Sequence, residues 1–91
     1  MDIRQLRYFI AIAEAPSLSA AAHRLGVAQP SLSQHVARME TELGVRLIDR
    51  SPRGSILTAE GQVLLRHARE ISAAMARCED EMRGLYGITE A

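Results

Sequence analysis

The stretch SLSAAAHRLGVAQPSLSQHVARMETELG, residues 17–44, decides the fold. Apolar residues recur at helical spacing over residues 18–25 and again in the second half of the stretch. Between the two runs, Gly26 stands where a helix ends in the left-handed conformation, and Pro30 suits the first turn of a following helix. Two short helices joined by a turn of about four residues are typical of a helix-turn-helix, which we expect at about residues 18–37.

The same periodicity predicts a helix over residues 3–14, ended by Pro16, and the core-facing side of each helix. Ser17 or Ser19 can cap the second helix. Tyr8 and Ile12 lie off the expected inner face of the first helix, which therefore has a second face to bury. The residues expected to face the core are Ile3, Leu6, Phe9, Ile10 and Ala13, then Leu18, Ala21, Ala22 and Leu25, then Leu32, Val36, Met39 and Leu43.

The outer side of the second helix in the motif carries small polar groups near its start. Ser31, Ser33 and Gln34 lie there, together with Pro30, and Arg38 follows one turn later. Short polar side chains let a helix approach the base edges in a major groove, and a glutamine can bond an adenine edge with two hydrogen bonds. A helix N-terminus also favours phosphate. The alternative is an ordinary surface helix with its polar residues facing solvent.

Residues 46–57 predict a β-hairpin, or wing. Val45, Leu47 and Ile48 are expected in the first strand, residues 50–54 form a turn rich in proline, glycine and arginine, and residues 55–57 return as the second strand. Arg50 and Arg53 stand in the turn, where an arginine can enter a narrow minor groove. The alternative is a solvated basic turn.

A long helix is predicted to begin after Thr58, a good N-cap, and to end at Gly84 and Gly87. Its apolar residues are spaced alternately by three and four, as in the seam of a coiled coil. A helix of about 42 Å at 1.5 Å per residue exceeds what this small domain can cover, so we expect a second copy of the chain to cover it. The seam consists of Gly61, Leu64, Ala68, Ile71, Met75, Cys78, Met82 and Leu85.

The net charge is zero, but the charges are unevenly distributed. Residues 1–69 carry nine arginines and six acidic residues, whereas residues 70–91 carry two arginines and five acidic residues. This asymmetry suggests a polyanion-binding head on an acidic stalk. All eleven basic residues are arginine, which suits phosphate and guanine recognition but also fits a coding bias. One cysteine and no long apolar run indicate a cytoplasmic protein without a membrane span.

Catalysis is the first rival reading, and the chain offers little for it. The obvious ligands or bases are His23, His35, His67 and Cys78, and none stands at a metal-binding spacing. Cys78 falls in the seam, where a buried inert thiol is expected.

A helical dimer that binds only protein is the second rival. A salt titration separates the two functions, because binding to duplex DNA would weaken steeply with salt and binding to a protein partner would weaken less.

Residues 6–65 closely resemble the DNA-binding domain of LysR-type transcriptional regulators. The resemblance lies in five ordered motifs: S-x-S-x-A-A, Q-P-S-L-S, E-x-x-L-G-V-x-L-I-x-R, R-G-x-x-L-T and T-x-x-G. It implies a mainly α winged helix-turn-helix over residues 1–58, with a three-helix core. It also implies a linker helix over 59–87 that forms an antiparallel homodimer. Beyond the two glycines, the tail at 88–91 is expected to fray.

The resemblance also implies a function: sequence-specific binding of double-stranded DNA as a transcription regulator that reads an inverted repeat. Higher oligomers are expected only for a full-length protein. The effector-binding domain is expected to be absent, and with it the site for a small-molecule inducer, so no cofactor and no metal are expected.

Two departures matter: Ala28 replaces a capping serine, so that the cap is lost or passes to Gln29, and Gln34 replaces a frequent arginine. The expected DNA-binding residues are Gln29, Pro30, Ser31, Ser33, Gln34, Arg50, Arg53, Ser17, Ser19, Arg4, His35 and Arg38, and the dimerisation residues are Leu64, Ala68, Ile71, Met75, Cys78 and Met82.

Overall fold

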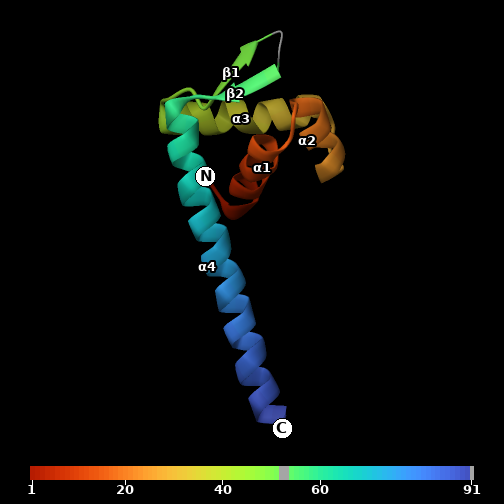
Figure 1. The fold of residues 1–91 in the computed structure, drawn as a ribbon, viewed down its shortest axis with the longest axis vertical. Coiled ribbons are helices and arrows are strands. Elements are labelled where there is room, and N and C mark those ends of the chain that lie inside the picture. The colour runs from red at the N-terminus through yellow and green to blue at the C-terminus, as the bar shows by residue number, and fades with distance from the viewer. Residues whose placement is uncertain (52–53, 91) are drawn as a thin grey trace.

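A computed structural model describes residues 1–51 and 54–90, with side chains described except at 50–55 and 85–90. Three helices form a compact head, a two-stranded hairpin lies beside it, and a long helix leads away as a stalk (Figure 1). The molecule measures 56 × 26 × 19 Å along its principal axes. The elements in order are α1 (Ile3–Glu14), α2 (Leu18–Leu25), α3 (Gln29–Leu43), β1 (Ile48–Ser51), β2 (Gly54–Leu57) and α4 (Ala59–Glu90).

The core lies where α1, α2 and α3 meet the base of the hairpin and one turn of α4. Phe9, Leu32, Met39 and Leu47 are its largest fully buried side chains. The inward residues predicted for α2 and α3 are confirmed except at two positions, because Leu25 is only half-buried and Leu43 is 40% exposed. The remaining buried apolar residues are Leu6, Ile12, Leu18, Ala21, Ala22, Val36, Ile48 and Ala68.

On α1 the predicted inner face is rotated from the observed one. Ile12 is buried, whereas Ile10 and Ala13 are only half-buried. Three helices, α2, α3 and α4, pack on this helix. A helix that serves several neighbours buries a wider strip than one periodic stripe predicts.

The helix ends follow from local hydrogen bonding. Asp2 caps α1: its carboxylate accepts from the Gln5 amide at 2.8 Å, and the Gln5 side chain accepts from the Asp2 amide at 3.0 Å. Ser17 caps α2, and its hydroxyl accepts from the Ala20 amide at 3.0 Å. Gly26 ends α2 in the left-handed conformation, at φ 69°. These bonds set the short turn between the two helices of the motif.

The hairpin is anchored to α3 by Glu40. Its carboxylate accepts from the Leu47 amide at 2.8 Å and from the Ile48 amide at 3.4 Å. The strands pair antiparallel, with Ile48 opposite Leu57 and Ser51 opposite Gly54. The first strand therefore begins three residues later than Val45, the predicted start, because Glu40 takes the amides that a longer strand would use. Val45 is 37% exposed.

Thr58 joins the hairpin to α4. Its hydroxyl donates to the Arg46 carbonyl at 2.6 Å and accepts from the Gly61 amide at 2.9 Å, as expected of an N-cap. A Cβ on Gly61 would collide with the Leu47 carbonyl oxygen. Glycine at this position therefore lets the first turn of α4 pack directly on the backbone before β1.

The stalk is longer than predicted. It runs unbroken through Gly84 and Gly87 to Glu90, so the predicted end at these glycines is wrong, whereas the predicted fraying of the tail stays a prediction. A glycine inside a helix costs about 1 kcal/mol but keeps its hydrogen bond, unlike proline. Toward its start α4 packs on α1, where Arg69 pairs with Glu14 at 3.5 Å.

Candidate nucleic-acid interface

The first turns of α3 present the polar surface that the sequence predicts. Gln29, Pro30, Ser31 and Gln34 are exposed, and Ser33 is half-buried. Ala28 is the N-cap and supplies no side-chain hydrogen bond, which confirms that the cap is lost. Because no side chain caps the first-turn amides, this helix end can accept an anion.

Ser19 and Gln29 join α2 to this surface. The Ser19 hydroxyl donates to the Gln29 side-chain oxygen at 3.3 Å, and both residues are exposed. Ser17 is half-buried and its hydroxyl oxygen is occupied as the cap of α2. Of the two serines predicted to meet phosphate, Ser19 therefore has the freer hydroxyl.

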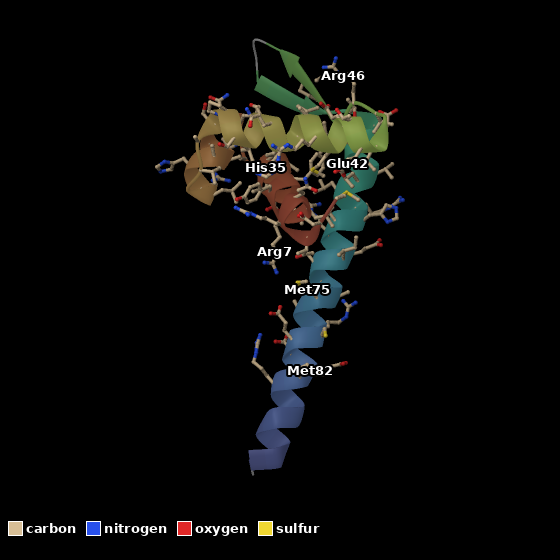
Figure 2. The ribbon with its side chains drawn as sticks, turned by 180° about the vertical axis from the view of Figure 1, so that it is seen from behind. Arg7, His35, Glu42, Arg46, Met75 and Met82 are labelled. Carbon is tan, nitrogen blue, oxygen red and sulfur yellow. The ribbon has the colours of Figure 1, made fainter. Side chains whose placement is uncertain are left out.

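The hairpin extends from the end of α3 that lies opposite α2 in the fold (Figure 1). Arg50 was predicted to stand in the turn of the hairpin. It lies instead in β1, opposite Ser55. Arg53 lies outside the described residues. Arg46, at the base of the hairpin, is exposed and pairs with Asp49 at 3.7 Å (Figure 2). Sequence reasoning did not single out Arg46, although it is the first residue of the predicted wing.

Arg4 and His35 lie on either side of Tyr8. The Arg4 Nε donates to the Tyr8 hydroxyl at 3.3 Å, and this bond raises the pKa of Arg4, which stays charged. The Tyr8 and His35 rings meet edge to face, with centroids 4.9 Å apart. His35 is half-buried and its Nδ1 is buried without a hydrogen-bond partner. The predicted phosphate contact of His35 therefore competes with packing against α1, whereas Arg4 and Arg38 are exposed.

Some residues of the predicted seam of α4 face their own chain, and the others face solvent. Ala68 is fully buried in its own chain, and a Cβ at Gly61 would meet Leu47, so neither faces a partner. Met75 is half-buried, and its sulfur accepts from Arg7 of α1 at 3.1 Å (Figure 2). Ala68 is buried in its own chain, which contradicts the seam assignment there, and Gly61 packs on the backbone before β1 while Met75 contacts α1. The seam residues Ile71, Cys78 and Met82 are exposed in the single chain, so the buried, inert thiol predicted for Cys78 requires a second copy and stays a prediction.

Other kinds of site find little support in the part of the chain that the structure describes. No group of three or more histidine, cysteine or acidic side chains there is placed to hold a metal ion. Among the same residues, no helix combines the length and apolar character needed to cross a membrane.

A polar recognition helix, a supporting helix and a hairpin beside them define a winged helix-turn-helix protein. Residues 3–62 match the family described as bacterial regulatory helix-turn-helix protein, lysR family. The match covers well over half of the chain, so the protein belongs to the lysR family. The expectation from the five sequence motifs is confirmed.

Named relatives and solved structures agree with this assignment. The chain is 47% identical over 83 residues to the HTH-type transcriptional regulator TcbR of Pseudomonas sp. (strain P51). The aligned region covers 91% of this chain and 28% of TcbR. It is 54% identical over 79 residues to ShiR of Corynebacterium glutamicum (strain R), covering 85% of this chain and 27% of ShiR. The chain thus spans less than a third of the length of these relatives.

Two solved DNA complexes share the fold. The CbnR_DBD–DNA complex matches with a TM-score of 0.87 and 46% identity, over 93% of this chain and 98% of that one. The complex of BenM_DBD with benA site 1 DNA matches with a TM-score of 0.88 and 33% identity, over 93% of this chain and 99% of that one. The winged helix-turn-helix fold with a long C-terminal helix is confirmed.

Proposed function

We propose that this chain is the DNA-binding part of a transcription regulator, and that it binds double-stranded DNA sequence-specifically as a homodimer. Helix α3 enters the major groove, and the hairpin reaches toward the adjacent minor groove. Two copies related by a two-fold axis read two half-sites of an inverted repeat. The observation that carries the proposal is the exposed polar start of α3 on a fold that two DNA-bound relatives share.

The chemistry of α3 supports direct reading of bases. Gln34 is exposed in its second turn, and an amide side chain there can donate to and accept from one adenine edge. Ser31 and Ser33 are short enough to keep the helix close to the groove floor. The Ser19–Gln29 hydrogen bond holds the Gln29 side chain against α2, which restricts its freedom before DNA arrives.

Phosphate contacts follow from the helix ends and the arginines. The first-turn amides of α3, the Ser19 hydroxyl and the guanidinium groups of Arg4 and Arg38 are the groups we assign to the DNA backbone. Such contacts position a protein on DNA without reading its sequence. The binding residues need no cofactor or metal, and binding to a bacterial chromosome would place the protein in the cytoplasm. Nothing in this arrangement serves catalysis.

Selection of bound sequences from random duplex DNA tests the proposal and gives the half-site with its spacing. For the selected site, we expect the logarithm of the binding constant to fall linearly with the logarithm of salt concentration, because phosphate contacts release counterions. A chain that enriches no sequence and shows no salt-dependent binding to any duplex would overturn the proposal and favour a module that binds only protein.

Gln34→Ala and Gln62→Ala form a matched pair for the recognition helix. Both residues are exposed glutamines, but Gln62 lies on α4, away from the surface assigned to DNA. We expect Gln34→Ala to weaken binding by about 1–3 kcal/mol and to relax preference at one base pair. Gln62→Ala is expected to bind like the unaltered chain. Equal affinities of the two variants would remove Gln34 from the interface.

A further inference from the structure

Arg46 is an exposed arginine on a backbone that hydrogen bonds hold in place. The Arg46 carbonyl accepts from the Thr58 hydroxyl at 2.6 Å, and the next carbonyl, of Leu47, accepts from the Thr58 amide at 3.0 Å. The Leu47 amide in turn donates to the Glu40 carboxylate at 2.8 Å. The side chain of Arg46 is 74% exposed. A fixed segment of backbone therefore presents a long cationic side chain to the surroundings of the protein.

Arg46 lies at the rim of a hollow that continues the face of α3 assigned to the bases. Gln34, Ala37 and Thr41 are spaced by three and four residues, so they share one exposed face of the helix. The hollow begins at the last two of them and has a volume of about 420 Å³. Two of its residues are alanine and glycine, so a neighbouring backbone can come close here. The lining consists of Ala37, Glu40, Thr41, Gly44, Val45 and Arg46.

The segment from Gly44 to Leu47 joins the two elements that the proposed function sends into different grooves. One sugar–phosphate backbone separates a major groove from the adjacent minor groove, so this segment passes over it. Residue 44 lies ten residues beyond Gln34, about 15 Å along the helix, whereas a major groove is about 12 Å wide. With Gln34 at the bases, the end of α3 and the base of the hairpin therefore lie above phosphates. Figure 2 shows Arg46 at this place.

Asp49 of β1 holds the Arg46 side chain in the absence of DNA. A carboxylate oxygen of Asp49 lies 3.7 Å from the Arg46 Nε, and the Asp49 side chain is 69% exposed. A carboxylate and a phosphate offer a guanidinium group the same kind of charged oxygen acceptor. Asp49 therefore occupies a side of the guanidinium group that a phosphate would take. Because so exposed a pair is weak, a phosphate can displace the carboxylate.

The other acidic side chains at the hollow are engaged elsewhere. Glu40 is half-buried and accepts from two backbone amides at the start of the hairpin. Glu42 binds the Met1 amino group at 2.7 Å. Among the ion pairs between described residues, Arg46 takes part in the one with Asp49. Of these carboxylates, Asp49 is therefore the one that opposes an anion at Arg46.

We propose that Arg46 binds a phosphate of the DNA backbone between the two grooves, and that Asp49 competes with this phosphate for the guanidinium group. The contact positions the hairpin on DNA without reading sequence. The pair therefore tunes affinity for any duplex and leaves base preference unchanged. This inference rests on the proposed function and adds a binding residue outside the groups assigned to DNA above.

Arg46→Ala tests the phosphate contact on two duplexes, the selected site and a scrambled sequence of equal length. We expect Kd to rise about tenfold for both, because each of the two copies loses a phosphate contact. The slope of log binding constant against log salt concentration should become shallower by about 0.9 per bound copy. Arg46→Lys keeps the charge and should keep most of the affinity. Thermal unfolding should not change, because the bond to Thr58 uses the Arg46 carbonyl.

Arg83→Ala is the matched control for the loss of charge. Arg83 pairs with Asp80 at 3.6 Å, also at a three-residue spacing, and both side chains are exposed on the stalk. The control removes the same charge from the chain, away from the surface assigned to DNA. We expect it to bind both duplexes with the Kd and salt dependence of the unaltered chain.

Asp49→Asn tests the competition. Removing the carboxylate frees the Arg46 side chain, so we expect Kd for both duplexes to fall about threefold. In the Arg46→Ala background the same change should gain clearly less, because no guanidinium group is left to release. Asp80→Asn, the control on the stalk, should leave Kd unchanged. Equal gains in both backgrounds would show that Asp49 only repels DNA directly, and the competition would be overturned.

Failure of this inference is distinct from failure of the proposed function. If Arg46→Ala binds both duplexes like the unaltered chain, the phosphate contact is overturned while sequence-specific binding stands. A loss confined to the selected duplex would also overturn it, because that pattern indicates base reading. A chain that enriches no sequence and binds no duplex at low salt would overturn the proposed function, and this inference with it.

Discussion

The Arg7 guanidinium donates a hydrogen bond to the Met75 sulfur at 3.1 Å, and so ties the stalk to the first helix of its own chain. The two residues are 68 positions apart in sequence. With the Arg69–Glu14 ion pair at 3.5 Å, this contact sets the direction in which α4 leaves the head. It also turns Met75 away from the surface that a second copy would cover.

Ile71→Glu and Met75→Glu should therefore act differently on the dimer. Ile71 is a predicted seam residue of α4 and is 44% exposed, so a carboxylate there would be buried unpaired against a second copy and should split the dimer. A glutamate at position 75 would instead meet Arg7 and leave the dimer largely intact. Sedimentation equilibrium measures both. A larger loss for Met75→Glu would return Met75 to the interface.

Gly61→Ala and Gly84→Ala should change stability in opposite directions. A methyl group at position 61 meets the Leu47 carbonyl, so we expect a loss of about 1–3 kcal/mol. Position 84 is open helix surface, and alanine there should gain about 0.5–1 kcal/mol. Urea unfolding at one fixed protein concentration checks both, because the stability of a dimer depends on concentration. An unchanged midpoint for Gly61→Ala would contradict the close approach.

Ala28→Ser should stabilise α3. Ala28 has the extended backbone of an N-cap, at φ −73° and ψ 141°, but offers no side-chain acceptor. A serine hydroxyl there can accept an amide of the first turn and should add about 1 kcal/mol. Thermal unfolding should shift upward by about 4–8 °C. Ala37→Ser, on the exposed middle of the same helix, is the control and should gain nothing.

The helices of the head were predictable because their signals are local. The inward stripe of Leu18, Ala21 and Ala22, the left-handed Gly26 and the uncapped Ala28 each depend on a few neighbouring residues, and all three are confirmed. The capping box of Asp2 and Gln5 has an equally local signal, a three-residue spacing. The first turns of α3 were predictable for the same reason.

The features that could not be predicted depend on packing between distant segments. The seam of α4 has the same three-and-four spacing whether its partner is α1 or another chain, so spacing alone could not assign Ala68 to the head. The late start of β1 depends on the Glu40 carboxylate, seven residues earlier. The place of His35 against Tyr8 depends on how α3 crosses α1.

Arg53→Ala should weaken DNA binding by about 1–3 kcal/mol if the hairpin reaches the minor groove. The prediction rests on the sequence of the turn. Arg24→Ala is the matched control, because Arg24 lies in the last turn of α2 and is exposed. Fluorescence anisotropy at physiological salt compares the two. Unchanged affinity for Arg53→Ala would reject the assignment of the wing to DNA.

Glu40→Ala should loosen the hairpin from the head. The Leu47 amide belongs to a residue that is 1% exposed, and it would lose its acceptor inside the protein, which costs about 1–3 kcal/mol. Glu42→Ala is the control: Glu42 is exposed, and it binds the Met1 amino group at 2.7 Å, which raises the pKa of that group. Losing so exposed a pair should cost little stability. Hydrogen exchange should show faster exchange at Leu47 and Ile48 in Glu40→Ala alone, and equal exchange in both variants would remove Glu40 as the anchor of the hairpin.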